Sequence, residues 1–263
     1  MDEPLLQASQ LLNLLLRYWW PFCRIMAVLS LAPIFNHQAV PMRVRILIAL
    51  VLTAALGGAL PLPPEIDPFS AQAVLVTLEQ IGIGLLLGLS LQMVFAIFSL
   101  VAGVVSTPMG LSMAVANDPV NAVSSSPLLY QLYFALLVFL FFAIDGHLVT
   151  VSVLYQSFVH WPVGNGLHYA GFTAVIHSFG WVLAAALLIA VPVAFCMILV
   201  LFGFGLLNRI SPAMNLFSLG FPVAITCGLL LIYLTVPNLA EAYLNLTRQL
   251  LDNLDLVLRS GNG

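Results

Sequence analysis

Long apolar runs separated by short polar or proline-rich stretches make up most of the chain. A helix of about 20 apolar residues can cross a hydrocarbon core about 30 Å thick, and several of the runs approach that length. The pattern therefore predicts an all-α, polytopic integral membrane protein built of long, kinked helical hairpins. The runs cover approximately residues 11–33, 44–60, 71–105, 128–158 with a break at 145–147, 181–207 and 221–236.

The composition supports this class and excludes several chemistries. Of the 263 residues, 62% are hydrophobic and only 6% are charged, against roughly 25% charged residues in soluble domains. Lysine is absent, which rules out a phosphate-binding P-loop and a lysine Schiff base. A net charge of −3 without a basic cluster argues against nucleic acid as a partner. No HExxH, GxSxG or HxxxH pattern occurs, so we expect no catalytic residue, no metal site and no cofactor.

Charged residues lie inside several apolar segments, and we single out Arg24 in the first and Glu79 in the third. Arg24 follows Pro21, where we expect the first helix to break, and Glu79 lies near the start of the third segment. A charged side chain at the centre of a span costs roughly 2.5–3.5 kcal/mol, so each should face protein or water. We predict that these two residues pair with each other. Gly84 and Gly88 form a GxxxG motif, which would let another helix approach closely.

The third segment and the stretch that follows it do not fit a simple span. At 1.5 Å per residue the segment would be roughly 50 Å long, so we expect it to bend or to leave the membrane plane. Residues 106–127 are rich in small polar residues but include Met109 and Met113. Long loops of this kind are usually either functional or disordered. Two interpretations stay open: the methionines pack in a core, or they belong to a flexible seal.

The triplet Asp145-Gly146-His147 interrupts the fourth segment. An Asp and a His two residues apart could relay protons, but Asp-Gly is also a strong turn signal, and we favour the turn. The relay interpretation leads to an alternative function. In it, the chain is a proton-coupled secondary transporter or channel that uses Arg24, Glu79, Asp145 and His147 within the membrane, and the isolated chain transports a solute.

The stretch from Asn208 to Pro222 separates the last two apolar runs with an arginine, two prolines and a glycine. We interpret it as the turn of a two-helix hairpin that begins at about residue 175. Pro212 and Pro222 should end the helices, and Asn215 can hydrogen-bond the freed backbone. The tail beyond residue 238 is amphipathic, with apolar residues at helical spacing at 246, 250, 254 and 257.

Several short motifs follow one another along the chain in a specific order. They are Arg24 with LAPIF ending at Phe35, VPMRVR at 40–45, Glu79 with Gly82 and Gly88, MGLSMA at 109–114 with Asp118-Pro119, Asp145-Gly146-His147, Ser157 with Pro162 and Gly164, and NRISPAMNLFSLGFP at 208–222. Together, over nearly the whole chain, they resemble the FliR family of flagellar biosynthetic proteins, which are components of type III secretion export gates. GFP at 220–222 resembles the flagellar branch more than the virulence-secretion branch. Ser106-Thr107-Pro108 departs from the family, in which a glutamine-containing segment is common here.

The resemblance implies a gate in which one copy of this protein joins several copies of two smaller membrane proteins, FliP-like and FliQ-like, in a helical hetero-oligomeric pore. Within a single domain 1–263, residues 1–174 would resemble the larger partner, and residues 175–263 would form a hairpin resembling the smaller one. Unfolded flagellar subunits would be the transported substrates. Membrane lipid and further export-apparatus proteins would be the other partners, in the bacterial inner membrane at the flagellar basal body.

The resemblance also assigns roles to residues. The stretch after the third segment would plug the pore, with methionines as sealing side chains and Gly110 giving the backbone freedom to move. The polar residues within apolar segments would serve assembly. The plug would consist of Ser106, Thr107, Pro108, Met109, Gly110, Leu111, Ser112 and Met113. The loop at the cytoplasmic mouth would carry Arg209, Pro212, Asn215 and Phe217. The assembly residues would be Arg24, Glu79, Asp145 and His147, and Gly84 and Gly88 would pack helices.

Overall fold

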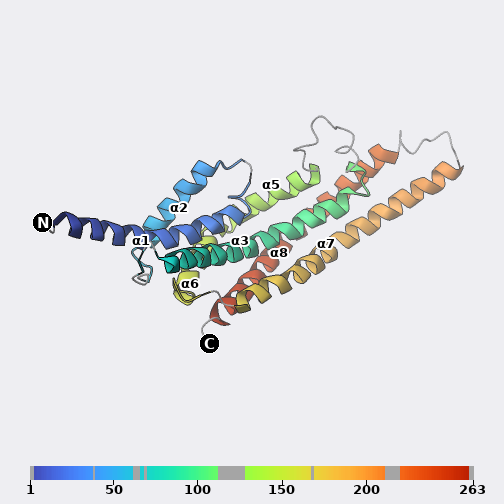
Figure 1. Ribbon diagram of the computed structural model, residues 1–263. Helices are drawn as coiled ribbons and strands as arrows, with labels where there is room; N and C mark the ends of the chain where they lie inside the picture. Colours follow the sequence, from blue (N-terminus) through green and yellow to red (C-terminus); the bar gives the residue numbers. More distant parts are fainter. Residues whose placement is uncertain are drawn as a thin grey trace. The chain divides into compact units, whose positions relative to one another are not determined.

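A computed structural model describes residues 3–37, 39–61, 66–67, 70–111, 128–166, 169–210 and 220–260. Within these ranges the chain is all-α and contains no strand, which confirms the expected fold class (Figure 1). The helices are α1 Glu3–Leu31, α2 Met42–Leu56, α3 Ala71–Ser106, α5 Leu128–Ala143, α6 Gly146–His160, α7 Tyr169–Ile210 and α8 Phe221–Ser260.

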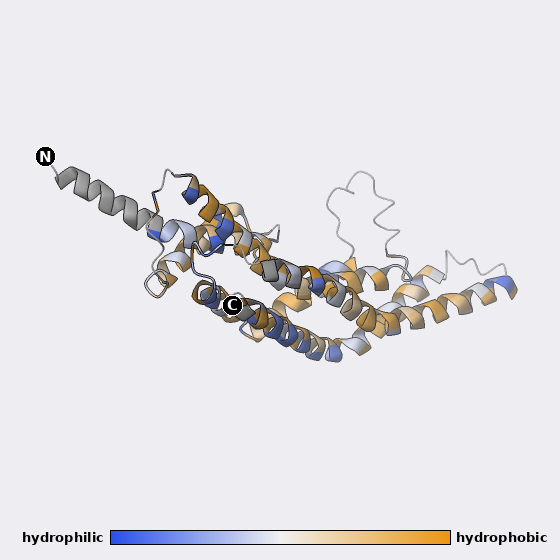
Figure 2. Ribbon diagram, turned by 60° about the horizontal axis from the view of Figure 1, so that its bottom comes forward, coloured by the Kyte–Doolittle hydropathy of each residue, from blue (hydrophilic) through white to orange (hydrophobic). Residues whose placement is uncertain are grey.

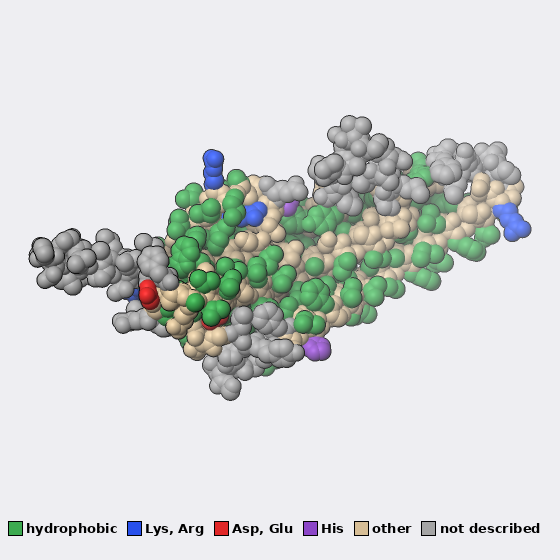
Figure 3. Space-filling view, viewed as in Figure 1, with side chains coloured by type: hydrophobic (Ala, Val, Ile, Leu, Met, Phe, Trp, Pro, Cys, Tyr) green, Lys and Arg blue, Asp and Glu red, His purple; other side chains and the backbone are tan. Residues whose placement is uncertain are grey.

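Among the described residues, three helices are long and apolar enough to cross a membrane, namely Ala71–Ser106, Val175–Ile210 within α7 and Phe221–Leu256 within α8. A fourth span results if α5 and α6, which are separated by a short break, count as one. Figure 2 shows that most of the described helical residues are hydrophobic. On the face drawn in Figure 3, hydrophobic side chains cover the long helices and charged ones are few. Such a surface suits lipid or other apolar helices better than water.

Two sequence-based expectations about the helices need correction or refinement. The break expected at Pro21 is wrong, because α1 continues through it, as α7 continues through Pro192 and α8 through Pro237. A proline inside a helix removes one amide donor and its ring crowds the carbonyl of residue i−4, but long apolar helices packed against neighbours tolerate both effects. The third segment is a single 36-residue helix, roughly 54 Å long, so it exceeds a hydrocarbon core of about 30 Å.

The chain forms two compact units. The first contains Met1–Gln92, Asp145–Ser178 and Gln249–Gly263. In it α1 packs against α2 and against the first half of α3. Trp20, Ala73 and Val76 form a small buried cluster between α1 and α3. Side chains from two connecting segments, Ile66 and Val163, close over this cluster.

The second unit contains Met93–Ile144 and Phe179–Arg248. Aromatic side chains hold α3, α5 and α8 together in it. The ring centroid of Phe95 on α3 lies 6.1 Å from that of Phe134, 6.5 Å from that of Phe141 and 6.2 Å from that of Tyr243. Such tilted and edge-on contacts stabilise a core beyond the area that they bury.

The C-terminal part of α8 is amphipathic, as its sequence predicts. Its apolar stripe is buried, while Asp252 lies on the exposed face. Near the C label, Figure 2 shows the hydrophilic residues of this helix. The buried stripe consists of Leu239, Tyr243, Leu246, Leu250, Leu254 and Leu258.

Candidate functional site

A fully buried arginine joins three helices of the first unit. Arg24 on α1 is 0% exposed. Its Nε donates a hydrogen bond to Oε1 of Gln80 on α3 at 2.8 Å. One terminal nitrogen donates to the Trp161 carbonyl at 2.8 Å, and the other donates to the Ser157 carbonyl at 2.9 Å and to the Ser157 hydroxyl at 3.3 Å. The guanidinium carbon also lies 4.2 Å from the ring centroid of Phe158.

Arg24 holds the C-terminal end of α6. The last four carbonyls of a helix lack partners within the helix, and their dipoles attract a cation. The carbonyls of Ser157 and Trp161 belong to that end of α6. The Ser157 carbonyl already accepts from the Trp161 N–H at 3.0 Å. A guanidinium stays charged and offers five donors in a planar fork, so one side chain adds a donor to this carbonyl, supplies one to the Trp161 carbonyl and still reaches Gln80. We call Arg24, Gln80, Ser157, Phe158 and Trp161 the arginine junction.

Glu79 is linked to the arginine junction through Gln80. The Gln80 amide nitrogen donates to Oε1 of Glu79 at 3.1 Å, and the backbone N–H of Gly164 donates to the same oxygen at 3.2 Å. Glu79 is 7% exposed, so its charge is held by two donors in a buried place. The hydrogen bonds of Arg24 go to other groups, and the expected direct pairing of Arg24 with Glu79 is therefore replaced by an indirect one.

Two glycines let α3 approach α1 closely at this junction. A Cβ atom built on Gly84 would lie 2.5 Å from the carbonyl oxygen of Arg24 and 2.6 Å from Cβ of Ala27. One built on Gly88 would lie 2.9 Å from the carbonyl oxygen of Val28 and from Cβ of Leu31. Real Cβ atoms do not come so near. Any larger residue would separate the helices that the guanidinium joins.

Asp145 and His147 lie at the opposite end of α6 from the arginine junction. Asp145 adopts a left-handed conformation with φ 54° between α5 and α6. It is exposed, and His147 is half-buried. From His147 to Ser157 α6 rises about 15 Å at 1.5 Å per residue. The triplet thus forms the turn that we favoured, and the four residues of the relay interpretation fall into two separate pairs.

The segment after α3 turns back on itself and buries a methionine. Ser106 ends the helix, and residues 107–110 form a turn in which the Gly110 N–H donates to the Thr107 carbonyl at 3.1 Å. Gly110 has φ +75°, which favours glycine. Met109 is 0% exposed and packs against α8 in the second unit.

Other residues assigned by the resemblance are only partly described. Arg209 is exposed in the last turn of α7, a position at which a cation favours the helix dipole. Ser112, Met113, Pro212, Asn215 and Phe217 lie outside the described residues. Their roles remain predictions.

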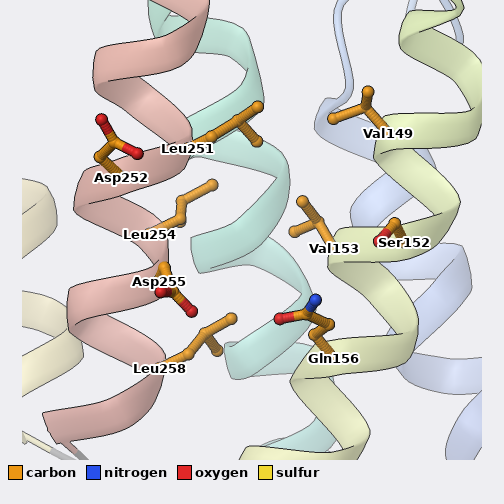
Figure 4. A pocket seen from close by; sticks show the side chains of 9 residues that line it. All are labelled: Val149, Ser152, Val153, Gln156, Leu251, Asp252, Leu254, Asp255 and Leu258. Carbon is orange, nitrogen blue, oxygen red and sulfur yellow. The ribbon is translucent and has the colours of Figure 1, made fainter.

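A groove of about 380 Å³ lies between α6 and the end of α8 in the first unit. In Figure 4 leucines of α8 face valines of α6 across it, and Gln156 and Asp255 lie near one end. Among the described residues no group of three or more His, Cys, Asp or Glu side chains could hold a metal ion. The groove carries no arrangement of groups that indicates catalysis.

Most partners in the arginine junction and around Met109 give no signal in the sequence. The roles of Gln80, Phe158 and Trp161 depend on a helix that is distant in sequence. The small residues Gly220, Ala224 and Gly228 were also missed, although their spacing of four is a recognisable signal of close helix packing.

Comparisons with known proteins identify the family. A family model described as "Bacterial export proteins, family 1" matches residues 15–250. The chain is 32% identical over 234 residues to the flagellar biosynthetic protein FliR of Escherichia coli (strain K12), and the match covers 89% of each chain. It is also 32% identical over 228 residues to FliR of Pectobacterium carotovorum subsp. carotovorum, covering 86% of this chain and 87% of that one.

A translocation protein is similar as well. The chain is 30% identical over 230 residues to the Yop proteins translocation protein T of Yersinia pestis, and the match covers 83% of this chain and 86% of that one. The arginine junction and the segment after α3 both lie within residues 15–250, the range that the family model matches. The chain therefore belongs to the FliR family of bacterial export proteins.

Proposed function

We propose that this chain is a structural component of the flagellar type III protein export gate, in which it lines and plugs the channel that unfolded flagellar subunits cross. The family and the apolar helices support the general part of this assignment. The chain is an inner-membrane component of a type III secretion export apparatus and not an enzyme. The flagellar assignment, the place in the basal body and the plug belong to the proposal.

The burial of Met109 is the observation that supports a plug in this segment. A loop that merely connected two spans would leave its side chains in water or lipid. Here Ser106 is buried, Met109 is fully buried, and the turn depends on a positive φ at Gly110. A methionine fills irregular space and adapts to changing neighbours, which suits a seal that opens and closes. The plug in this proposal spans residues 106–113.

The long apolar helices support a multi-pass subunit that assembles with others. The helix α7 exposes large apolar side chains along most of its length, among them Leu188 and Phe202, and α8 exposes them over residues 229–236, among them Tyr233. FliP-like and FliQ-like proteins, in several copies, are the partners that we propose for these faces. In this proposal residues 175–263 form a hairpin that resembles the smaller partner, and Arg209, Pro212, Asn215 and Phe217 lie at the cytoplasmic mouth.

Deletion of residues 109–113 tests the plug. We expect the inner membrane of cells that carry the shortened chain to leak ions and small dyes, because the pore then lacks its seal. The amount of chain in the membrane, measured by immunoblot, serves as the control for assembly. A membrane as tight as that of the wild type, with the shortened chain present in the gate, would reject the plug.

A pull-down in mild detergent separates the gate from the alternative of a proton-coupled transporter. The gate proposal expects the tagged chain to co-purify with two other membrane proteins, and the chain alone to be unstable. The transporter alternative expects the purified chain to move a solute by itself. A stable, active single chain would contradict the gate.

A further inference from the structure

The first turns of α8 carry a face of small residues that lies beneath the segment after α3. Gly220, Ala224 and Gly228 recur every four residues and are all buried. Residues four apart share one face of a helix. The face is therefore a continuous shallow surface, and it belongs to the same compact unit as Met109.

The side chain of Met109 lies directly on Gly228. A Cβ atom built on Gly228 would lie 2.5 Å from Cε, 2.6 Å from Cγ and 2.6 Å from Sδ of Met109. Three atoms of the side chain thus contact one spot on the helix, so even a methyl group at position 228 would overlap the thioether. Glycine in a helix interior is less favourable than alanine. At this position only glycine leaves room for the methionine.

A second contact holds the next residue of the same turn. A Cβ atom built on Gly110 would overlap the ring of Phe221. Phe221 and Gly228 are seven residues apart on α8, about 10.5 Å along the helix axis. The two glycine contacts therefore hold the segment at two separate points on one helix.

We propose that Gly228 and Phe221 form a socket on α8 that keeps the plug closed, and that Met109 leaves this socket each time a protein is exported. This rests on the proposed plug function. Both contacts are apolar, so no buried hydrogen bond is broken when the side chain departs. The flexible thioether can leave and return without a change in the fold of α8. Gly228 is thus a positioning residue for the plug.

Substitution of Gly228 tests the socket with a matched control in the same unit. We expect Gly228→Ala to displace Met109 and to raise the ion leak of resting cells by at least roughly tenfold, the factor that about 1.4 kcal/mol represents. Gly203→Ala on α7 introduces the same methyl group into open space, since a Cβ there has nothing within 4 Å. We expect no leak from it. Equal leaks from the two variants would overturn the socket.

A disulfide across the socket tests the required movement. Cγ of Met109 lies 2.6 Å from the Cβ position of residue 228. One C–C bond of about 1.5 Å then places the two Cβ atoms at most about 4.1 Å apart, within disulfide range. We therefore propose Met109→Cys with Gly228→Cys, in a background in which the native Cys23, Cys196 and Cys227 are alanine.

Oxidation of this double variant should reduce secretion of flagellar subunits at least tenfold, and dithiothreitol should restore it. Each single-cysteine variant serves as a control and should secrete normally under oxidant. Failure of the bridge to form, or normal secretion with the bridge formed, would overturn the socket. The plug is tested separately by the 109–113 deletion. If the deletion makes the membrane leak but the disulfide leaves secretion normal, the plug is retained and the socket is rejected. If the membrane of the deletion strain does not leak, both are rejected.

Discussion

The two ends of α3 are held by contacts of opposite chemistry. Near its start, Gln80 takes part in the arginine junction, in which a buried cation bonds directly to the end of another helix. At its C-terminal end the chain is held by a methionine that lies on a glycine, without a hydrogen bond from its side chain. Arg24 and Met109 are both fully buried, and both contacts depend on glycines: Gly84 and Gly88 let α3 approach α1, and Gly228 leaves room for the methionine.

The difference indicates which contact can open. In an apolar environment an unpaired polar group costs several kcal/mol, so the arginine junction resists any separation of its members. An apolar contact has no preferred direction, and breaking it costs only the free energy gained from the apolar area that it buried. We therefore interpret the arginine junction as a fixed point of the subunit and the Met109 contact as its moving part.

Removal of the guanidinium should have the largest effect. Arg24→Leu leaves Gln80 and the Trp161 carbonyl buried without their donor, so we expect the free energy of unfolding to fall by about 3–5 kcal/mol. The chain should then be depleted from the membrane, and motility should be lost. Immunoblots of membrane fractions and swarm diameters measure both effects.

A second arginine of the same helix is the control for this variant. Arg17 is half-buried and donates a single hydrogen bond of 3.4 Å to the Gly57 carbonyl. Arg17→Leu should cost less than about 1 kcal/mol. Arg24→Lys should fail nearly as badly as Arg24→Leu, because an ammonium cannot reach three separated acceptors. Normal levels of the Arg24→Leu chain would contradict the role of the arginine junction.

Widening the gap between α1 and α3 should have the next largest effect. Gly84→Val inserts carbon atoms where the carbonyl of Arg24 and the Ala27 side chain already lie, and overpacking of this kind costs about 1–3 kcal/mol. Gly103→Val changes the same helix at a position with open space. Thermal unfolding of the purified complex compares the stability of the two variants. A similar loss of stability in both would show that only the helix propensity of the residue had changed.

A conservative change at the moving part should have a smaller effect. Met109→Leu keeps an apolar side chain of nearly the same volume, so it should cost less than about 1.5 kcal/mol and retain a closed membrane. Met109→Asp places a charge against the apolar face of α8 at Gly228 and should open the seal. Dye uptake by resting cells distinguishes them, and a leak from the leucine variant equal to that from the aspartate variant would weaken the comparison.

The smallest effect is expected at the turn between α5 and α6, which belongs to neither contact. Asp145→Gly relieves a left-handed backbone, so stability should rise by less than about 1 kcal/mol and motility should be unchanged. Asp145→Ala keeps the strain and is the matched control. Loss of motility in the glycine variant would instead favour a proton relay that needs the carboxylate.

The sequence predicted the helices far better than the contacts between them. Apolar periodicity and the Asp-Gly signal placed the third segment at 71–105 and the fourth at 128–158 with its break, close to Ala71–Ser106, Leu128–Ala143 and Gly146–His160. The break expected at Pro21 was wrong, because the effect of a proline on its own helix does not take into account the neighbouring helices that support α1.

The partners of the two contacts could not be predicted in the same way. Ser157 and Trp161 lie 133 and 137 residues beyond Arg24, and a single charged residue in an apolar segment does not reveal which distant carbonyls it will meet. Gly228 left a weak signal in its spacing from Gly220 and Ala224. That signal predicts close packing on this face, but the segment that packs there is a matter of tertiary structure.

The conductance of the purified gate complex in a planar bilayer tests the central claim most directly. We expect the wild-type complex to be closed, and the complex with residues 109–113 deleted to conduct ions steadily under the same voltage. An Arg24→Lys complex that can still be purified should stay closed, since its defect lies in assembly. A deleted complex that is as closed as the wild type would contradict the account.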